Sequence, residues 1–345
     1  GDLVSAVLHV DLDRLARNIA VVRARVAPAA LMLVVKDDAY GHGVTHVVRR
    51  AVAEGVGWIG AFDVATALEV RAAVGQKPRV FVWMIAGESA IRSALDADLD
   101  LGVGDAELLE EVADAARARG TRARIHLKID TGLHRNGIRP EEWSDAVVRV
   151  VALAQEGVVE LAGVWSHIAE ASDEEDDLSR AAFERAVAAV TAAGFDRPLR
   201  HLAASAASSA RAEFRYDLVR VGAFCYGIRP AGGPTDAELG ISPIGSWDAR
   251  VISVDGDRVR IDAGALDGLV SALSGLVDLV TPAGPRRLLA VDEVSAVVSG
   301  WDGARVGDVV RIYGADAASP TDLAEAIGTI GEEIALRVSP LVERR

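Results

Sequence analysis

Residues 33–43 read Leu-Val-Val-Lys-Asp-Asp-Ala-Tyr-Gly-His-Gly, a short apolar run that ends in a lysine and a polar, glycine-containing turn. Only three of the 37 basic residues are lysines, namely Lys36, Lys77 and Lys128, so this chain generally uses arginine for positive charge. An amine can lose its proton and bond covalently to an aldehyde, whereas a guanidinium cannot. We interpret Lys36 as a chemically active amine at a strand end, against the alternative of a lysine that extends its ammonium into water.

The same succession of an apolar run and a helical pattern recurs up to about residue 230. Strands are predicted at 31–36, 57–62, 79–84, 98–103, 123–129, 161–168, 198–204 and 217–223. Alanine-rich amphipathic segments such as 105–119 and 177–193 are predicted to be the helices between them. Apolar strands that alternate with helices indicate a parallel sheet, and eight of them predict an α/β fold with a (β/α)₈ TIM barrel. A doubly wound sheet is the alternative.

The pattern changes after residue 230. Residues 231–240 resemble a linker or loop. Short alternating segments that predict a mostly β domain follow at 249–254, 257–262, 286–299 and 308–313. We therefore predict a barrel domain at residues 1–230 and a smaller, mostly β C-terminal domain at residues 231–345. Residues 1–10 contain a strand-like segment that is able to pair with the β domain.

Composition and charge limit the classes of partner. The net charge of −14 argues against binding to nucleic acid or to an anionic membrane. No apolar run reaches the length of a membrane span, and the single cysteine, Cys225, is typical of a reducing cytoplasm. The acidic run at residues 173–177 is interpreted as a solvated loop leading into a helix rather than as a metal site. We predict a cytoplasmic protein without a metal.

Polar residues stand at the ends of several predicted strands, where barrel enzymes carry their chemistry. They are Lys36 with Tyr40, Lys128 with Arg135, His167, His201 with Ser205, and Arg220 with Gly222. Such a set offers an amine for an aldehyde, an imidazole to stack on a ring and an arginine to face a ring nitrogen. A serine and backbone N–H groups beside a glycine suit a phosphate. Together they predict pyridoxal 5'-phosphate as the cofactor.

Four motifs, in order along the chain, resemble the alanine racemase family, whose members combine a pyridoxal-phosphate barrel with a C-terminal β domain. They are Val-Val-Lys-Asp-Asp-Ala-Tyr-Gly-His-Gly (34–43), Lys-Ile-Asp-Thr-Gly-Leu-His-Arg-Asn-Gly (128–137), His-Leu-Ala-Ala-Ser-Ala-Ala (201–207) and residues 216–230. The resemblance implies an amino-acid substrate. It also implies a homodimer, in which the β domain of one chain would cover the barrel mouth of the other.

The resemblance further implies a role for each matching residue. Lys36 would hold the cofactor covalently and act as a catalytic base. The phosphate would be bound by Tyr40, Ser205 and the backbone at Gly222 and Tyr226. Arg135 would lie near the phenolic oxygen and the substrate carboxylate, positioned by Lys128, which is often carbamylated in the family. The ring would contact His167 on its face and Arg220 at its nitrogen.

The chain departs from the family at the second catalytic base, a tyrosine that the partner subunit supplies from a loop between two strands. Residues 246–254 match the strand before that loop, and Gly264-Ala-Leu-Asp-Gly268 resembles the downstream Gly-Tyr-Ala-Asp-Gly. Only residues 255–263 lie between them, so the tyrosine loop is predicted to be deleted. After residue 230 the chain contains a single tyrosine, Tyr313.

Other parts of the partner-supplied site also differ. The family's Met-Asp pair reads Val291-Asp292, and its C-terminal tyrosine reads Glu332. Loss of one acid–base group typically lowers a rate by ~10²–10⁴-fold. Three hypotheses follow. The first is an amino-acid racemase with an altered second base, which would be Asp262, Asp267, Glu332 or a water. The second is a one-base enzyme such as a decarboxylase or lyase, and the third is a non-catalytic cofactor-binding paralogue.

Overall fold

The computed structural model describes residues 6–202 and 205–345. Its internal contacts divide the chain into two compact units. The barrel unit consists of Val22–Lys36 and Val48–Gly222, and the β unit consists of Asp37–Val47, Ala223–Arg345 and the described part of Gly1–Val21. The chain therefore passes from one unit to the other directly after Lys36. The domain boundary predicted between residues 230 and 231 stays a prediction.

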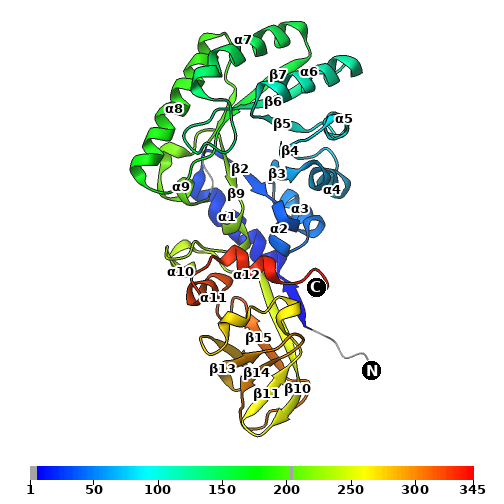
Figure 1. The fold of residues 1–345 in the computed structure, drawn as a ribbon, viewed down its shortest axis with the longest axis vertical. Helices are drawn as coiled ribbons and strands as arrows, with labels where there is room; N and C mark the ends of the chain where they lie inside the picture. The colour runs from blue at the N-terminus through cyan, green and yellow to red at the C-terminus, as the bar shows by residue number, and fades with distance from the viewer. Residues whose placement is uncertain (1–5, 203–204) are drawn as a thin grey trace. The chain divides into compact units, whose positions relative to one another are not determined.

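The barrel unit is built on a parallel sheet of eight strands in the order β8-β7-β6-β5-β4-β3-β2-β9 (Figure 1). The strands are β2 (Ala30–Val34), β3 (Trp58–Asp63), β4 (Arg79–Met84), β5 (Asp100–Val103), β6 (Ala123–Lys128), β7 (Val159–Trp165), β8 (Leu199–His201) and β9 (Leu218–Val221). The two ends of the sheet meet, since the Asp217 N–H donates to the Arg200 carbonyl oxygen at 3.1 Å. The predicted TIM-type barrel is confirmed, and the doubly wound alternative is wrong.

The barrel interior is filled by large side chains that the strands point inward. Met32, Phe81, Trp165 and Leu218 form one buried cluster, and none of them is more than 4 % exposed. Strand residues in such a barrel are buried on both faces, which explains the continuous apolar runs in the sequence. The polar residues that interrupt these runs therefore need specific partners inside the barrel.

Helices follow the strands along the chain and lie outside the curved sheet in Figure 1. Their bounds are α3 (Val44–Ala53), α4 (Val64–Val74), α5 (Glu88–Asp96), α6 (Ala106–Arg119), α7 (Pro140–Glu156), α8 (Asp173–Ala192), α9 (Ser205–Ala210) and the 3₁₀ turn η1 (Ala212–Phe214). The earlier α1 spans Leu12–Val26. In the described ranges, no helix is both long enough and apolar enough to cross a bilayer.

The acidic run 173–177 is helical rather than a loop, which corrects the sequence-based interpretation. Ser172 caps α8, because its hydroxyl accepts a hydrogen bond from the Glu175 N–H at 3.2 Å. Carboxylates are favourable in the first turn of a helix, where unpaired N–H groups carry partial positive charge. The acidic residues therefore begin the helix.

The β unit contains a mostly antiparallel sheet in the order β11-β14-β13-β12-β15-β10-β1-β16. The strands are β1 (Val7–Val10), β10 (Gly245–Asp255), β11 (Arg258–Ile261), β12 (Asp278–Thr281), β13 (Gly284–Val291), β14 (Ala296–Ser299), β15 (Val309–Tyr313) and β16 (Glu343–Arg344). β1 pairs antiparallel with β10, so that Leu8 lies opposite Trp247. The N-terminal strand is therefore part of this sheet.

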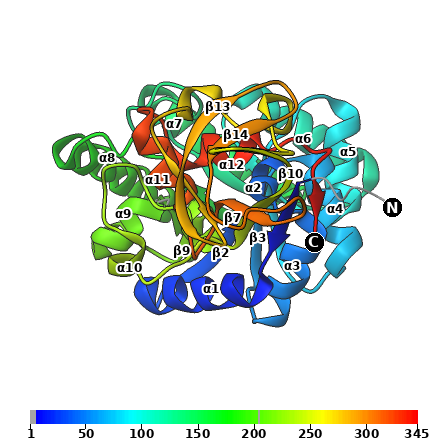
Figure 2. The ribbon, with the colours of Figure 1, turned by 90° about the horizontal axis from the view of Figure 1, so that it is seen from below.

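Two predicted segments of the β unit differ in detail from the structure. The alternating segment predicted at 286–299 is a hairpin of β13 and β14, which lie side by side in Figure 2. The turn between them is closed by the Asp292 N–H, which donates to the Ser295 carbonyl oxygen at 2.8 Å. The predicted loop 231–240 contains a short helix. Helical elements of this unit are η2 (Ala223–Tyr226), α10 (Asp236–Leu239), η3 (Ala265–Asp267), η4 (Ser271–Leu273), α11 (Pro320–Ala326) and α12 (Gly331–Arg337).

Candidate active site

Lys36 stands at the start of an unusual turn. It opens α2 (Lys36–Gly41), in which the residues from Asp37 to Tyr40 have φ between 52° and 56° and ψ between 35° and 52°. This is one turn of left-handed helix, and each non-glycine residue in it costs about 1–2 kcal/mol. Hydrogen bonds hold the turn: the Val44 N–H donates to Asp38 Oδ1 at 3.1 Å, and the Gly43 N–H donates to the Asp38 carbonyl oxygen at 3.0 Å. Backbone strain of this kind is concentrated at functional sites.

Arg220 is the anchored guanidinium of the barrel unit. It lies on β9 opposite Met32 of β2, four residues before Lys36. Arg220 NH1 lies 2.7 Å from His201 Nδ1, and Arg220 NH2 donates to the Ser166 carbonyl oxygen at 2.8 Å and to the Leu202 carbonyl oxygen at 3.3 Å. Burial lowers the pKa of Arg220 to about 10, which leaves it charged at neutral pH. Its partners are neutral groups, so its positive charge is not cancelled by them.

His167 stands two residues after the end of β7, among the positive charges of the site. Burial and then the charges of Arg220, Lys128, Arg135 and Lys36 lower the pKa of His167 to about 3, so its imidazole is neutral. We call these four residues the cationic cluster. The structure thus brings together five of the predicted site residues. An anionic ligand would be stabilised beside the cluster, which fits a cofactor with a phenolic oxygen and a substrate with a carboxylate.

Lys128 is the buried amine of this cluster. Its Nζ lies 4.6 Å from the centroid of the Trp165 ring. Burial and the charges of Arg220 and Arg135 lower the pKa of Lys128 to about 8, against the opposing effect of Asp130. Asp130 Oδ1 accepts hydrogen bonds from the Gly132 and His134 N–H groups and so shapes the loop that carries Arg135. Arg135 itself is exposed on this loop.

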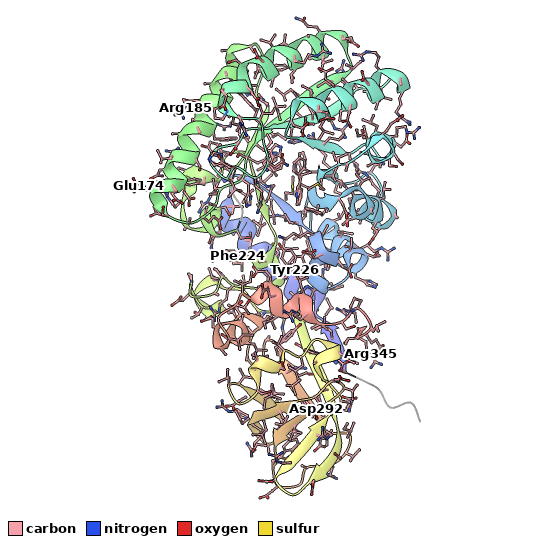
Figure 3. The ribbon with its side chains drawn as sticks, viewed as in Figure 1. Glu174, Arg185, Phe224, Tyr226, Asp292 and Arg345 are labelled. Atoms are coloured by element: carbon pink, nitrogen blue, oxygen red, sulfur yellow. The ribbon has the colours of Figure 1, made fainter. Side chains whose placement is uncertain are left out.

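The residues predicted to bind phosphate fall into two groups. In the barrel unit, Ser205 opens α9 and the buried Gly222 follows β9. In the β unit, Tyr40 and Tyr226 lie with ring centroids 4.8 Å apart, and His42 stacks on Tyr226 at 5.3 Å. Tyr226, labelled in Figure 3, ends the short turn η2. The two groups belong to different units, and their shared role in one site stays a prediction.

Two buried residues that are linked to Arg220 through His201 were missed by sequence reasoning. His126 on β6 bridges to the site, since its Nδ1 lies 2.9 Å from His201 Nε2. Asp100 on β5 lies behind it, with Oδ2 2.8 Å from His126 Nε2. Both side chains are 0 % exposed. The available signal was their polarity inside apolar parallel strands, where a charged or imidazole side chain needs a buried partner.

The β unit contains no replacement for the family's loop tyrosine at the same place. β10 and β11 pair with Asp255 opposite Arg258, which leaves only Gly256 and Asp257 as the turn between them. Tyr313 is 1 % exposed and packs in the sheet core against Trp247, with ring centroids 6.0 Å apart. It is therefore a core residue rather than a relocated base.

The proposed substitutes for that tyrosine already have structural partners or neighbours. Asp262 Oδ1 accepts from the Arg250 N–H at 2.7 Å, and Asp267 Oδ2 accepts from the Gly264 N–H at 2.9 Å. Burial raises the pKa of Asp262. Glu332 belongs to α12. The pKa of Tyr40 is raised first by the burial of its own ring and then by the negative charge of Glu332. Asp292 pairs with Arg260 NH1 at 2.6 Å.

Comparisons with known proteins agree with this geometry. The family described as alanine racemase, N-terminal domain, matches residues 10–230. The alanine racemase of Beutenbergia cavernae is 35% identical over 370 residues, covering 97% of this chain and 96% of that protein. That of Thermobifida fusca is also 35% identical, over 367 residues, with the same coverage. Both alignments exceed the 345 residues of this chain, so the relatives contain segments that it lacks.

Solved structures give the same result. The alanine racemase of D-cycloserine-producing Streptomyces lavendulae superposes with a TM-score of 0.93 at 34% identity, covering 100% of this chain and 97% of that one. The alanine racemase of Streptomyces coelicolor superposes with a TM-score of 0.94 at 30% identity, with coverage of 99% and 98%. The sequence alignment with the Beutenbergia cavernae protein covers 97% of this chain, and the superposition on the Streptomyces lavendulae structure covers 100% of it. This chain belongs to the alanine racemase family, whose enzymes are pyridoxal-phosphate-dependent isomerases.

Proposed function

We propose that this protein racemises alanine or a similarly small amino acid with pyridoxal 5'-phosphate as its cofactor. The observation that carries the proposal is the neutral His167 among the cationic cluster, which includes Lys36, the one lysine at the end of β2. When bound, the cofactor supplies an electron sink that makes the α-proton of an amino acid acidic. Lys36 would hold the cofactor and exchange that proton on one face of the α-carbon.

The other residues of the site would bind and orient. Lys128 and Arg135 would face the phenolic oxygen and the substrate carboxylate, because both belong to the cationic cluster. Arg220 would hold the ring nitrogen from the floor of the barrel, and His167 would lie against the ring. Tyr40, Ser205, Gly222 and Tyr226 would bind the phosphate through hydroxyl and backbone N–H groups.

The second face of the α-carbon requires a different proton donor than in a two-base racemase. We infer that a carboxyl group of the partner's β unit or a water molecule supplies this proton. Racemisation is then expected to be slower by ~10²–10⁴-fold, the usual effect of losing one acid–base group. The sequence-based alternatives, a one-base enzyme and a cofactor-binding paralogue, become outcomes of the test below.

The test is solvent-deuterium incorporation at the α-carbon of L- and D-alanine, followed by proton NMR with added pyridoxal phosphate. Exchange with inversion is expected. Exchange with retention of one enantiomer would overturn the racemase and indicate a one-base enzyme, and no exchange despite bound cofactor would indicate a paralogue that only binds it. Lys36→Ala should abolish exchange, whereas Lys77→Ala, a change at an exposed lysine, should not.

We further propose that the protein is a cytoplasmic homodimer. Two apolar side chains support a contact surface in the β unit: Leu266 and Val294 are each 67% exposed. They are neighbours, since the Leu266 N–H donates to the Glu293 carbonyl oxygen at 2.8 Å. Sedimentation at micromolar concentration should show a dimer, and Leu266→Asp should weaken it. A monomeric wild-type protein would contradict the proposal.

A further inference from the structure

A line of four hydrogen-bonded polar side chains crosses the inside of the barrel. It runs from Asp100 through His126 and His201 to Arg220, with successive atom pairs 2.8, 2.9 and 2.7 Å apart. All four residues are less than 9% exposed, and they lie on β5, β6, β8 and β9. We call this line the relay. Buried polar groups in such a line must each satisfy a donor or acceptor, so its proton positions are constrained.

The two ends of the relay together constrain the protons between them, because a guanidinium only donates hydrogen bonds and an ionised carboxylate only accepts them. A guanidinium only donates hydrogen bonds, so His201 Nδ1 must accept from Arg220. His201 then carries its proton on Nε2 and donates it to His126 Nδ1. His126 in turn carries its proton on Nε2 and donates it to Asp100, which only accepts when ionised. Both imidazoles are therefore neutral Nε2–H tautomers.

The electrostatics of the buried groups agree with this assignment. Burial lowers the pKa of His126, and burial together with the charge of Arg220 lowers the pKa of His201 well below its usual value. Burial alone would raise the pKa of the Asp100 carboxyl. Hydrogen bonds from His126 and Arg79 and the positive charge of Arg79 more than offset this, and the pKa is lowered. An ionised Asp100 and two neutral histidines result.

Asp100 is fixed from the outer side by two arginines. Arg79 Nε and NH2 donate to its two oxygens at 3.3 and 2.5 Å, and Arg124 Nε donates to Oδ1 at 3.3 Å. One oxygen is thus shared by the two arginines, and the other receives Arg79 and His126. Asp100 has no freedom to rotate without losing a charge-assisted hydrogen bond.

The barrel also leaves space for the bridging imidazole. Gly163 lies on β7, and a Cβ atom at this position would overlap His126 Nδ1 and lie 3.0 Å from its Cε1. The Phe81 ring packs against His126 with centroids 4.9 Å apart, and Trp165 Nε1 donates to the His126 carbonyl oxygen at 3.0 Å. The ring is held in position by close packing as well as by hydrogen bonds.

We propose that Asp100 and His126 are positioning residues that hold His201 in its neutral Nε2–H tautomer, so that the His201 Nδ1 lone pair orients the Arg220 guanidinium in the site. The proposal rests on the proposed function only in assigning Arg220 to the cofactor ring. The tautomers themselves are a property of the protein alone.

The first experiment determines the tautomers by long-range ¹H–¹⁵N correlation on the full-length protein labelled with ¹⁵N-histidine, without added cofactor. The two relay histidines, assigned by His126→Leu and by elimination among the seven histidines, should each show a single Nε2–H form that does not titrate between pH 6 and 8. A protonated or Nδ1–H form of His201 in the wild-type protein would overturn the proposal.

The second experiment compares Asp100→Asn with Asp98→Asn. An asparagine amide at position 100 places an N–H group against a donor, either His126 or an arginine, and should produce mixed tautomers at His201. Asp98 contacts the same Arg124 at 2.7 Å but is 64% exposed and does not touch His126. Its variant should keep the wild-type tautomers. An unchanged His201 in folded Asp100→Asn would contradict the proposal.

Cofactor-dependent readouts connect the relay to the site. Asp100→Asn should shift the absorption maximum of bound pyridoxal phosphate and lower the α-proton exchange rate at saturating alanine by about 10–100-fold, by analogy with losing the hydrogen-bond partner of a metal-bound histidine. Unchanged absorption and rate, with altered tautomers, would overturn the assignment of Asp100 and His126 as positioning residues. If no amino acid exchanges at all, the proposed function fails while the tautomer result still stands.

A glycine variant covers the case in which Asp100→Asn does not fold. Gly163→Ala removes no polar group but pushes on His126, so the His201 Nε2–H proton signal should move upfield or disappear. Gly57→Ala is the matched control, since a Cβ there meets nothing within 4 Å. A wild-type His201 signal in Gly163→Ala would count against the proposal.

Discussion

The chemistry of individual residues in this protein depends mainly on burial among like charges. Burial and then the charges of nearby cluster residues lower the pKa of both Lys128, to about 8, and His167, to about 3. The same two causes, desolvation and like charge, are the ones that prepare amines and imidazoles for chemistry at neutral pH. Tyr313, outside the cluster, is buried in the sheet core against Trp247 and has a packing role.

We expect Lys128 to be carbamylated by dissolved CO₂. With a pKa of about 8, its amine becomes largely neutral as the pH rises through 8, and a neutral amine reacts with CO₂. The negative carbamate would be stabilised by Arg220 and Arg135. NMR with ¹³C-bicarbonate at pH 8.5 should show a carbamate signal that is lost in Lys128→Arg and kept in Lys77→Arg. A signal that survives Lys128→Arg would refute the assignment.

Replacement of Tyr313 should leave catalysis unchanged. Burial raises the pKa of its phenol, so it does not ionise at neutral pH, and its ring packs against Trp247. Tyr313→Phe should keep the rates of exchange from L- and D-alanine within about twofold and change the free energy of unfolding by no more than about 1 kcal/mol. A rate loss of ~10²-fold or more would instead identify Tyr313 as the relocated second base.

At the level of elements, the turn α2 joins the lysine strand to the β unit through left-handed backbone. Such a turn is unfavourable for L-residues, and its four non-glycine residues are held there by hydrogen bonds to Asp38 and Ala39. The hairpin of β10 and β11 has a minimal turn at Gly256 and Asp257. The loop that the family resemblance implies is absent from this hairpin, whereas the left-handed turn after Lys36 is present.

The left-handed turn predicts an unusual response to glycine. Ala39 has φ 53°, where glycine avoids the Cβ clash, so Ala39→Gly should stabilise the protein or leave the free energy of unfolding unchanged. In the ordinary helix α6, Ala115→Gly should instead cost roughly 0.5–1 kcal/mol. Urea unfolding followed by circular dichroism measures both. A loss at Ala39 as large as that at Ala115 would argue against the left-handed conformation.

At the level of the whole molecule, buried neutral histidines make the fold sensitive to acid. The pKa values of His42, His126, His167 and His201 are all lowered, chiefly by burial. A histidine whose folded-state pKa is depressed contributes stability that is complete above its unfolded pKa of about 6.5 and is lost as the pH falls below it. All four histidines therefore lower the stability of the fold as the pH falls.

Unfolding should accordingly become easier between pH 7 and 5.5. His42 and His167, with pKa values of about 4 and 3, are each expected to contribute roughly 1 kcal/mol to the loss, because the unfolded chain binds a proton that the folded chain does not. Urea midpoints at the two pH values measure the loss, and His42→Phe should reduce the pH dependence. The exposed His134 provides the control variant His134→Gln, which should leave the dependence unchanged. Equal urea midpoints at the two pH values would mean that the buried histidines also bind protons in the folded protein.

Much of the barrel was predictable because its signals are local. A buried parallel strand appears as an apolar run, and a following helix appears as an amphipathic segment, so β4 was predicted with its observed bounds at 79–84. The hairpin of β13 and β14 was missed because its turn, residues 292–295, contains no glycine or proline. The beginning of α8 was missed because acidic residues suit both a loop and the first turn of a helix.

The sequence by itself determined the architecture, the family and the strand ends that carry Lys36, Lys128, His167 and Arg220. Each of these follows from patterns within short segments. Only the tertiary structure decided the relay, since Asp100 and Arg220 are 120 positions apart and join through two imidazoles on intervening strands. It also placed Tyr313 in the core. Which polar side chains point to the same interior depends on the closure of the barrel, and pattern within a strand contains no information about it.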